Sequence, residues 1–74
     1  MRLLQPLRVV KVREMIRVLE RDGWRQVRQQ GSHRQFHHPA KPGTVTVAGH
    51  LGMDLRLGTL IEIYKQAGLE RKKS

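Results

Sequence analysis

Hydrophobic positions recur along this chain with two different spacings, and each spacing predicts a different element. Near the N-terminus they fall three and four residues apart, which is the period of one face of an α-helix. These positions are Val12, Met15, Ile16 and Leu19. Gly23 follows them and is suited to end the helix, because glycine adopts a left-handed backbone conformation without steric cost.

A second helical pattern lies near the C-terminus. Its apolar positions are Leu60, Ile63, Tyr64 and Ala67. Gly68 is placed to end this helix as Gly23 ends the first. Thr59 directly precedes this pattern, and Glu62 follows three residues later. This spacing predicts a capping box, with Thr59 at the N-terminus of the helix.

Between the two helical patterns, polar and apolar residues alternate as they do in strands. The alternating segments are WRQVRQQ (24–30), SHRQFHH (32–38) and TVTVA (44–48). A tight connection through Gly31 joins the first two, and the proline-rich segment PAKPG (39–43) is a loop. The glycine-punctuated segment 49–58 is predicted to be irregular.

The element order is therefore α-β-β-β-α, in a single α+β domain spanning residues 1–74. A three-stranded antiparallel sheet has one face free to pack both helices, so we expect the helices on one side and an open face on the other. The basic segment ERKKS (70–74) is expected to be a solvated tail.

Strand alternation assigns each side chain of the sheet to one of these faces, and a one-residue slip would invert the assignment. The helix-facing positions are Val27, Phe36, Val45 and Val47. The open face receives Gln26, Arg28, His33, Gln35, His37, Thr44 and Thr46. Trp24 has the parity of the open face, so we expect it to pack at the junction between helix and strand.

The composition adds a strong positive charge. The chain has 74 residues with 15 Lys+Arg against 6 Asp+Glu, a formal net charge of +9. This excess favours a polyanionic partner: nucleic acid, an anionic membrane surface or an acidic protein. The sequence has no cysteine, and no apolar run approaches the ~18 residues of a membrane span, so we expect a soluble cytoplasmic protein that does not enter the membrane.

Part of the charge forms a stripe on the first predicted helix. Arg13, Arg17 and Arg21 recur at every fourth residue. Such a stripe either contacts phosphates or is simply the solvated face of the helix, here partly offset by Glu14 and Glu20.

Histidines are concentrated in the segment GSHRQFHHP, residues 31–39, where carboxylates are absent. Between Asp22 and Asp54 the chain has no acidic residue, so this region cannot supply paired catalytic carboxylates or a Mg²⁺ site. His33 and His37 would lie about 13 Å apart on a strand, too far to share one ion, and we expect no metal. An acid–base role for a histidine and ordinary surface polarity both stay open.

Four segments of the chain carry a resemblance to a known family. They are VKVREMIRVLERDGW (10–24), VRQQGSHRQFHHP (27–39), VTVAGH (45–50) and GTLIEIYKQAGL (58–69). Together they resemble the HicA toxins of bacterial and archaeal HicA–HicB toxin–antitoxin systems, over nearly the whole chain. Residues 1–9 fall outside the match and are interpreted either as an N-terminal extension or as the result of a misplaced start codon.

The resemblance implies a double-stranded-RNA-binding-domain-like fold and a ribosome-independent ribonuclease that cleaves mRNA without a cofactor. The family's catalytic histidine follows a glycine and a serine, which places it at His33 after Gly31 and Ser32. A HicB-type antitoxin is the implied protein partner and would mask the site.

A metal-independent route follows from these residues as a hypothesis. His33 takes the proton of a ribose 2′-OH, and basic side chains bind the phosphate. The expected RNA-binding residues are Arg28, Gly31, Ser32, Arg34 and Lys41. The second proton-transfer group stays open among His37, His50, Lys41 and water. The competing functions are a non-catalytic double-stranded RNA-binding module and a protein that only sequesters an acidic partner.

Overall fold

The computed structural model describes residues 9–69 and confirms an α+β fold of two helices and a three-stranded antiparallel sheet. In chain order the elements are β1 Val10–Lys11, α1 Val12–Arg21, β2 Arg25–Gln30, β3 His33–His37, β4 Val45–Ala48, β5 Asp54–Leu55 and α2 Leu57–Gln66. The larger sheet has the strand order β2-β3-β4, so β3 is its central strand.

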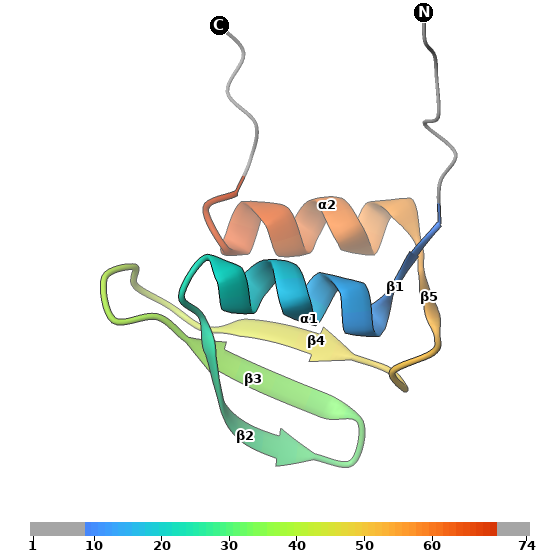
Figure 1. Cartoon of the computed structure of the whole chain (residues 1–74), viewed down its shortest axis with the longest axis horizontal. Helices are drawn as coiled ribbons and strands as arrows, with labels where there is room; N and C mark the ends of the chain where they lie inside the picture. Colours follow the sequence, from blue (N-terminus) through green and yellow to red (C-terminus); the bar gives the residue numbers. More distant parts are fainter. Residues whose placement is uncertain (1–8, 70–74) are drawn as a thin grey trace, which may run out of the picture.

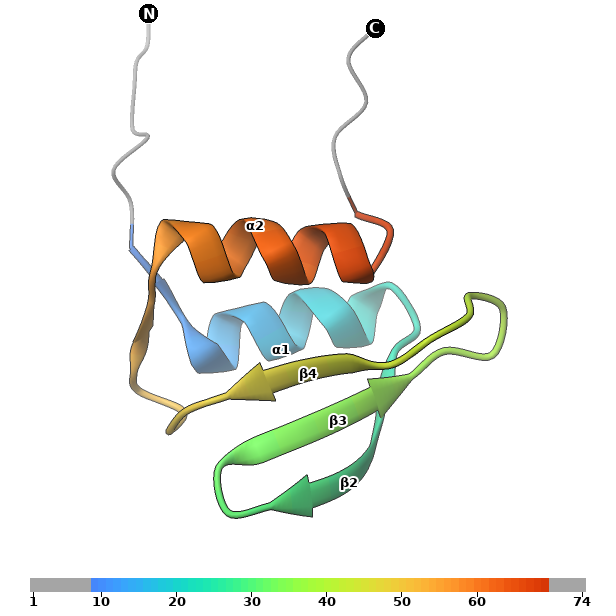
Figure 2. The ribbon, with the colours of Figure 1, turned by 180° about the vertical axis from the view of Figure 1, so that it is seen from behind.

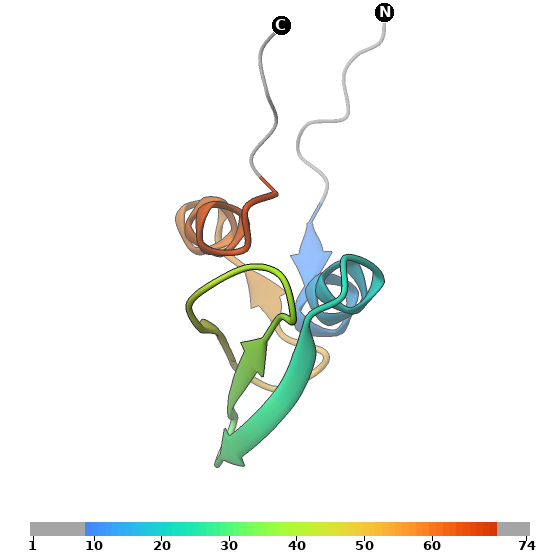
Figure 3. The ribbon, with the colours of Figure 1, turned by 90° about the vertical axis from the view of Figure 1, so that its left-hand side faces the viewer.

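Both helices lie side by side on one face of this sheet (Figures 1 and 3), as the sequence predicts. The apolar stripes of the helices meet the inward residues of the strands and form one core. Its buried members are Val12, Met15, Leu19, Trp24, Phe36, Val45, Val47, Ile63 and Ala67. No helix covers the opposite face of the sheet (Figure 1), within the part of the chain that the structure describes.

Each helix ends in the same way, at a glycine with positive φ. After α1, the N–H groups of Gly23 and Trp24 donate to the carbonyls of Glu20 and Leu19, both at 3.0 Å. Gly68 takes the corresponding place after α2, at φ 68°. These bonds form Schellman motifs, which satisfy carbonyl groups that have no partner within the helix.

The predicted start of α2 is wrong. The helix begins at Leu57, after Arg56, so Thr59 lies within the first turn and does not cap it. Arg56 has an extended backbone at φ −75° and ψ 152°, and its carbonyl accepts the N–H of Leu60 at 2.9 Å. The chain therefore enters the helix directly from β5, with no side-chain cap from Arg56.

A two-stranded sheet of β1 and β5 was not predicted, because two residues are too short for any periodicity to show. Val10 pairs with Leu55, and Lys11 pairs with Asp54. Next to this pair, the connection between β4 and β5 accepts the first N–H groups of α1. Val12 N–H donates to the Met53 carbonyl at 2.9 Å, which fixes this connection against the helix (Figure 2).

The parity assigned to β2 is wrong at its first half, because the register of β2 against β3 shifts between Gln26 and Arg28. An irregularity of this kind reverses the facing of the residues on one side of it. Gln26 pairs with the inward Phe36, so it lies on the helix side and not on the open face. Trp24, 1 % exposed, supplies the core contact expected of Val27, which is 54 % exposed.

Most of the expected extension 1–9 and all of the expected tail 70–74 lie outside the described residues, which include only Val9 of these segments. None of the helices between residues 9 and 69 has the length and apolar character needed to cross a membrane.

Candidate active site

His33 begins β3, immediately after the two-residue turn formed by Gly31 and Ser32. Gly31 has φ 59°, a conformation that glycine adopts readily, and the turn sets Gln30 opposite His33. On its other side His33 pairs with Ala48 of β4. The His33 side chain is exposed, and it has no hydrogen-bond or ion-pair partner among residues 9–69. Its ring is therefore free to exchange a proton with a bound molecule.

The face that His33 occupies is the open face of the sheet. Phe36 points into the core, so by alternation His33, Gln35 and His37 point away from it. Arg28 pairs directly with Gln35, which places it on the same face and diagonal to His33. Diagonal neighbours on paired strands lie about 7–8 Å apart, within reach of a long side chain. A guanidinium group and an imidazole thus share a surface, as the sequence predicts for Arg28 and His33.

Arg34 faces the other way. It pairs with the buried Val47, so it lies on the helix side of the sheet, and its Nη1 donates to the Gly49 carbonyl at 2.8 Å. The N–H of Gly49 in turn donates to the Ser32 carbonyl at 3.0 Å. The structure therefore does not bring Arg34 to the side of His33 as an open-face contact. Instead, Arg34 and Ser32 hold the end of β4 against the turn that carries His33.

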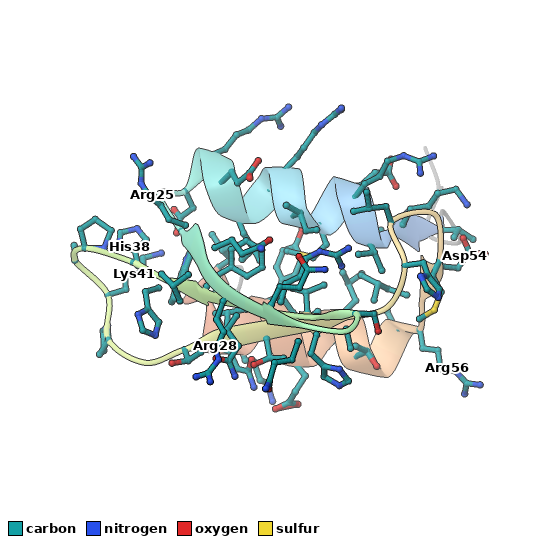
Figure 4. The ribbon with its side chains drawn as sticks, turned by 90° about the horizontal axis from the view of Figure 1, so that it is seen from below. Arg25, Arg28, His38, Lys41, Asp54 and Arg56 are labelled. Atoms are coloured by element: carbon teal, nitrogen blue, oxygen red, sulfur yellow. The ribbon has the colours of Figure 1, made fainter. Side chains whose placement is uncertain are left out.

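Lys41 is placed at the far end of the sheet from His33, in the loop between β3 and β4 (Figure 4). Its ammonium group donates to the Asp22 carboxylate and, at 3.1 Å, to the Ala67 carbonyl at the end of α2. The side chain therefore links the ends of both helices to the loop. This bonding lowers the pKa of Asp22, chiefly through the hydrogen bond from Lys41.

His38 completes this second cluster. Its Nε2 lies 2.6 Å from the Asp22 carbonyl, and its Nδ1 accepts the N–H groups of Ala40 and Lys41 at 2.9 and 3.2 Å. Because Nδ1 accepts, Nε2 carries the proton and donates to Asp22. The ring also meets Trp24 edge-on with 5.2 Å between centroids. His38 is thus a structural histidine, a role that the charge pattern of the sequence gave no means of predicting.

The three candidates for a second proton-transfer group are separated by the fold. Lys41 is engaged in the cluster just described, and His37, at the far end of β3, has its Nε2 3.1 Å from the Thr44 hydroxyl. His50 directly follows Gly49, which is bonded to Ser32, so it lies at the same end of the sheet as His33. His50 is exposed, and its carbonyl accepts the Met53 N–H at 2.9 Å.

Gln35 and Thr46 also belong to the site region, although the sequence singled out neither as a binding residue. Thr46 pairs with Gln35, and Gln35 with Arg28, which forms one polar row across all three strands. The alternation of the strands already placed these residues on the open face; what it lacked was the register that sets them in line. Across the described residues, no three histidine, aspartate or glutamate side chains are grouped to hold a metal ion.

Comparison with known proteins agrees with the resemblance noted in the sequence. The family model for the HicA toxin of bacterial toxin–antitoxin systems matches residues 12–69, from the first residue of α1 to just beyond the end of α2. No curated protein matches the chain. The matched segment contains the whole three-stranded sheet, both helices and every candidate residue of the site. This chain therefore belongs to the HicA toxin family.

Proposed function

We propose that this protein is a metal-independent endoribonuclease that cleaves mRNA in the cytoplasm and is neutralised by a HicB-type antitoxin. The observation that best supports the proposal is the position of His33. Its ring is exposed on the open face of the sheet, with Arg28 diagonal to it. No acidic residue occurs between Asp22 and Asp54, so no carboxylate of the sheet opposes the approach of a phosphodiester.

The chemistry follows from this arrangement. His33, as the neutral imidazole, accepts the proton of a ribose 2′-OH while the 2′ oxygen attacks the adjacent phosphorus. The bond from phosphorus to the 5′ oxygen breaks, and that oxygen takes up a proton. The products are a 2′,3′-cyclic phosphate and a 5′-OH end. Arg28 stabilises the charge that develops on the non-bridging oxygens, because its guanidinium group is positively charged and can donate two parallel hydrogen bonds.

His50 is the candidate that best fits the second proton transfer. Lys41 is bonded to Asp22 and His37 lies beside Thr44, both at the other end of the sheet. The bonds from Arg34 to Gly49 and from Gly49 to Ser32 hold the residue before His50 against the turn that carries His33. As an imidazolium, His50 would donate its proton to the leaving 5′ oxygen.

The experiment is RNA digestion in EDTA with wild-type and His33→Ala protein, followed by analysis of the product ends. We expect cyclic phosphate and 5′-OH ends from the wild type, and cleavage slower by about 10²- to 10⁴-fold for the variant. Unchanged thermal melting of the variant is the control, because the His33 side chain has no hydrogen bond or ion pair among residues 9–69. Products with 5′-phosphates, or a variant as fast as the wild type, would contradict the proposal. Binding without cleavage by the wild type would favour the non-catalytic RNA-binding module.

A further inference from the structure

The structure presents two positively charged surfaces, and they differ in their acidic residues. On α1, Arg13, Arg17 and Arg21 are exposed, but Glu20 lies among them and is exposed as well. On the open face of the sheet, Arg28 and the histidines have no carboxylate beside them, because none occurs between Asp22 and Asp54. A phosphate chain therefore meets less opposing charge on the sheet than on the helix.

We infer that a single strand of RNA lies along the open face of β3, with its phosphates and riboses on a path formed by β2, β3 and β4. We call this surface the sheet path. Its residues are Arg28, His33, Gln35, His37 and Thr46. The inference rests on the proposed function and extends it, since it states where the substrate lies beyond the cleaved bond.

The register of the strands supports this path. Arg28, Gln35 and Thr46 stand opposite one another across the three strands, in direct backbone pairs. His33 and His37 mark the two ends of β3, about 13 Å apart, which is long enough for a strand of a few nucleotides. All five side chains can hydrogen-bond to phosphate or hydroxyl oxygens through guanidinium, imidazole, amide or hydroxyl groups.

The large aromatic side chains do not lie on the sheet path, and of its five residues only Arg28, His33 and His37 have a flat group on which a base can stack. The chain has one Trp, one Phe and one Tyr. Trp24 and Phe36 are buried in the core, and Tyr64 packs against that core from α2. Recognition on the sheet path therefore uses mainly the backbone of the RNA, so affinity should depend strongly on salt concentration.

The test compares two matched pairs of variants, each made in His33→Ala protein so that the RNA survives. The probe is a single-stranded RNA oligonucleotide that wild-type protein cleaves. Thr46→Glu adds a carboxylate to the sheet path, whereas Thr59→Glu adds one to the first turn of α2, on the other side of the molecule. Arg28→Gln removes a charge from the path, whereas Arg17→Gln removes one from α1.

We expect Thr46→Glu to weaken RNA binding by at least about tenfold, with Thr59→Glu within about twofold of the parent. Arg28→Gln should reduce the slope of log affinity against log salt by about 0.7, the value of one phosphate contact on a single strand, and Arg17→Gln should leave it unchanged. Thermal melting of each variant reports whether it is folded. A further variant, Gln35→Ala, tests the path without changing its charge, and we expect it to lose about three- to tenfold in RNA affinity.

Equal affinities within both matched pairs would overturn the sheet path, as would larger losses from Arg17→Gln than from Arg28→Gln. In the first case the RNA does not extend over the open face beyond the cleaved bond, and in the second its main contact is on α1. The proposed function is tested separately: it fails if the wild type does not cleave RNA.

Discussion

The two ends of β3 carry similar residues and use them in opposite ways. At one end the His33 side chain is exposed and has no hydrogen-bond or ion-pair partner among the residues described. Just past the other end, both ring nitrogens of His38 are engaged by backbone groups, and the ring packs against Trp24. One imidazole is therefore available for chemistry, whereas the other is part of the folded structure.

The basic side chains near the two ends show the same contrast. Arg28, beside His33, has an exposed guanidinium on the open face. Lys41, beside His38, donates to the Asp22 carboxylate and to the last turn of α2. Sequence proximity to a histidine thus says little about availability. What decides it is whether the fold supplies a carbonyl or carboxylate within hydrogen-bond reach.

The largest expected effect concerns His50, which lies at the same end of β3 as the exposed His33. If His50 donates a proton to the leaving oxygen, His50→Ala should slow RNA cleavage by about 10²- to 10⁴-fold. The effect should disappear on an oligonucleotide whose leaving oxygen is replaced by sulfur, because a thiolate leaves without being protonated. Cleavage rates of both substrates, with the break placed at the same bond, measure this.

His33→Ala is the matched control for that experiment. A missing base slows attack by the 2′-OH whatever the leaving group is, so this variant should be slow on both substrates. A His50→Ala protein that is equally slow on both would show that His50 acts on binding or structure, and one that is fast on both would show no role at all.

The next largest effect concerns the other end of β3, where both ring nitrogens of His38 are bonded. There His38→Ala should lower the free energy of unfolding by roughly 2–3 kcal/mol. The variant loses the Nε2–H bond to Asp22 and the acceptor for two backbone N–H groups of the loop. The free energy of unfolding in urea measures this. His37→Ala is the control, since that side chain is exposed with a single partner, and we expect a change within about 0.5 kcal/mol. Equal losses for the two variants would show that the bonds of His38 add no more stability than the single contact of His37.

Gly23 shows how closely His38 is packed at this end. A Cβ added at Gly23 would lie 2.8 Å from His38 Nε2, and the residue has φ 105°. Both the backbone conformation and the ring therefore require glycine here. The sequence predicted a glycine helix end at this position, but the ring that packs on it comes from the far end of β3.

Much of the fold was predictable because it depends on local patterns. Amphipathic spacing identified both helices, and Gly23 and Gly68 identified their ends. The start of α2 was not predictable from Thr59 and Glu62, since a tertiary contact, the pairing of Lys11 with Asp54, brings the chain into the helix earlier. A local capping signal is outweighed when the preceding residues are held in a sheet.

The site was predictable where strand alternation determined it. Alternation along β3 placed His33 on the open face, and the structure agrees. The same alternation puts Arg34 on the opposite face. Arg34 was nevertheless expected to bind RNA, because that expectation used only its closeness to His33 in the sequence and not the side of the strand. The shift at Val27 and the bond from Lys41 to Asp22 depend on contacts between distant segments, which no local pattern contains.

The smallest effect concerns Asp22, and it depends on pH. The pKa of Asp22 is lowered, first by the hydrogen bond from Lys41, while partial burial opposes the shift. A carboxyl group with a lower pKa in the folded state adds stability above its unfolded pKa, and this stability is lost as the pH falls through the folded value. The contribution should therefore be present at about pH 7 and fade below about pH 4.

Asp22→Asn should lower the free energy of unfolding by about 1 kcal/mol at about pH 7, and the difference from wild type should shrink at about pH 3. Asp54→Asn is the matched control: it removes an exposed ion pair with Lys11, worth no more than about 0.5 kcal/mol. Urea unfolding at both pH values measures the two differences. If Asp22→Asn and Asp54→Asn behave alike, the Lys41 contact is an ordinary surface pair. Lys41 would then be free to reach a phosphate, and the basic side chains at the two ends of β3 would be equally available.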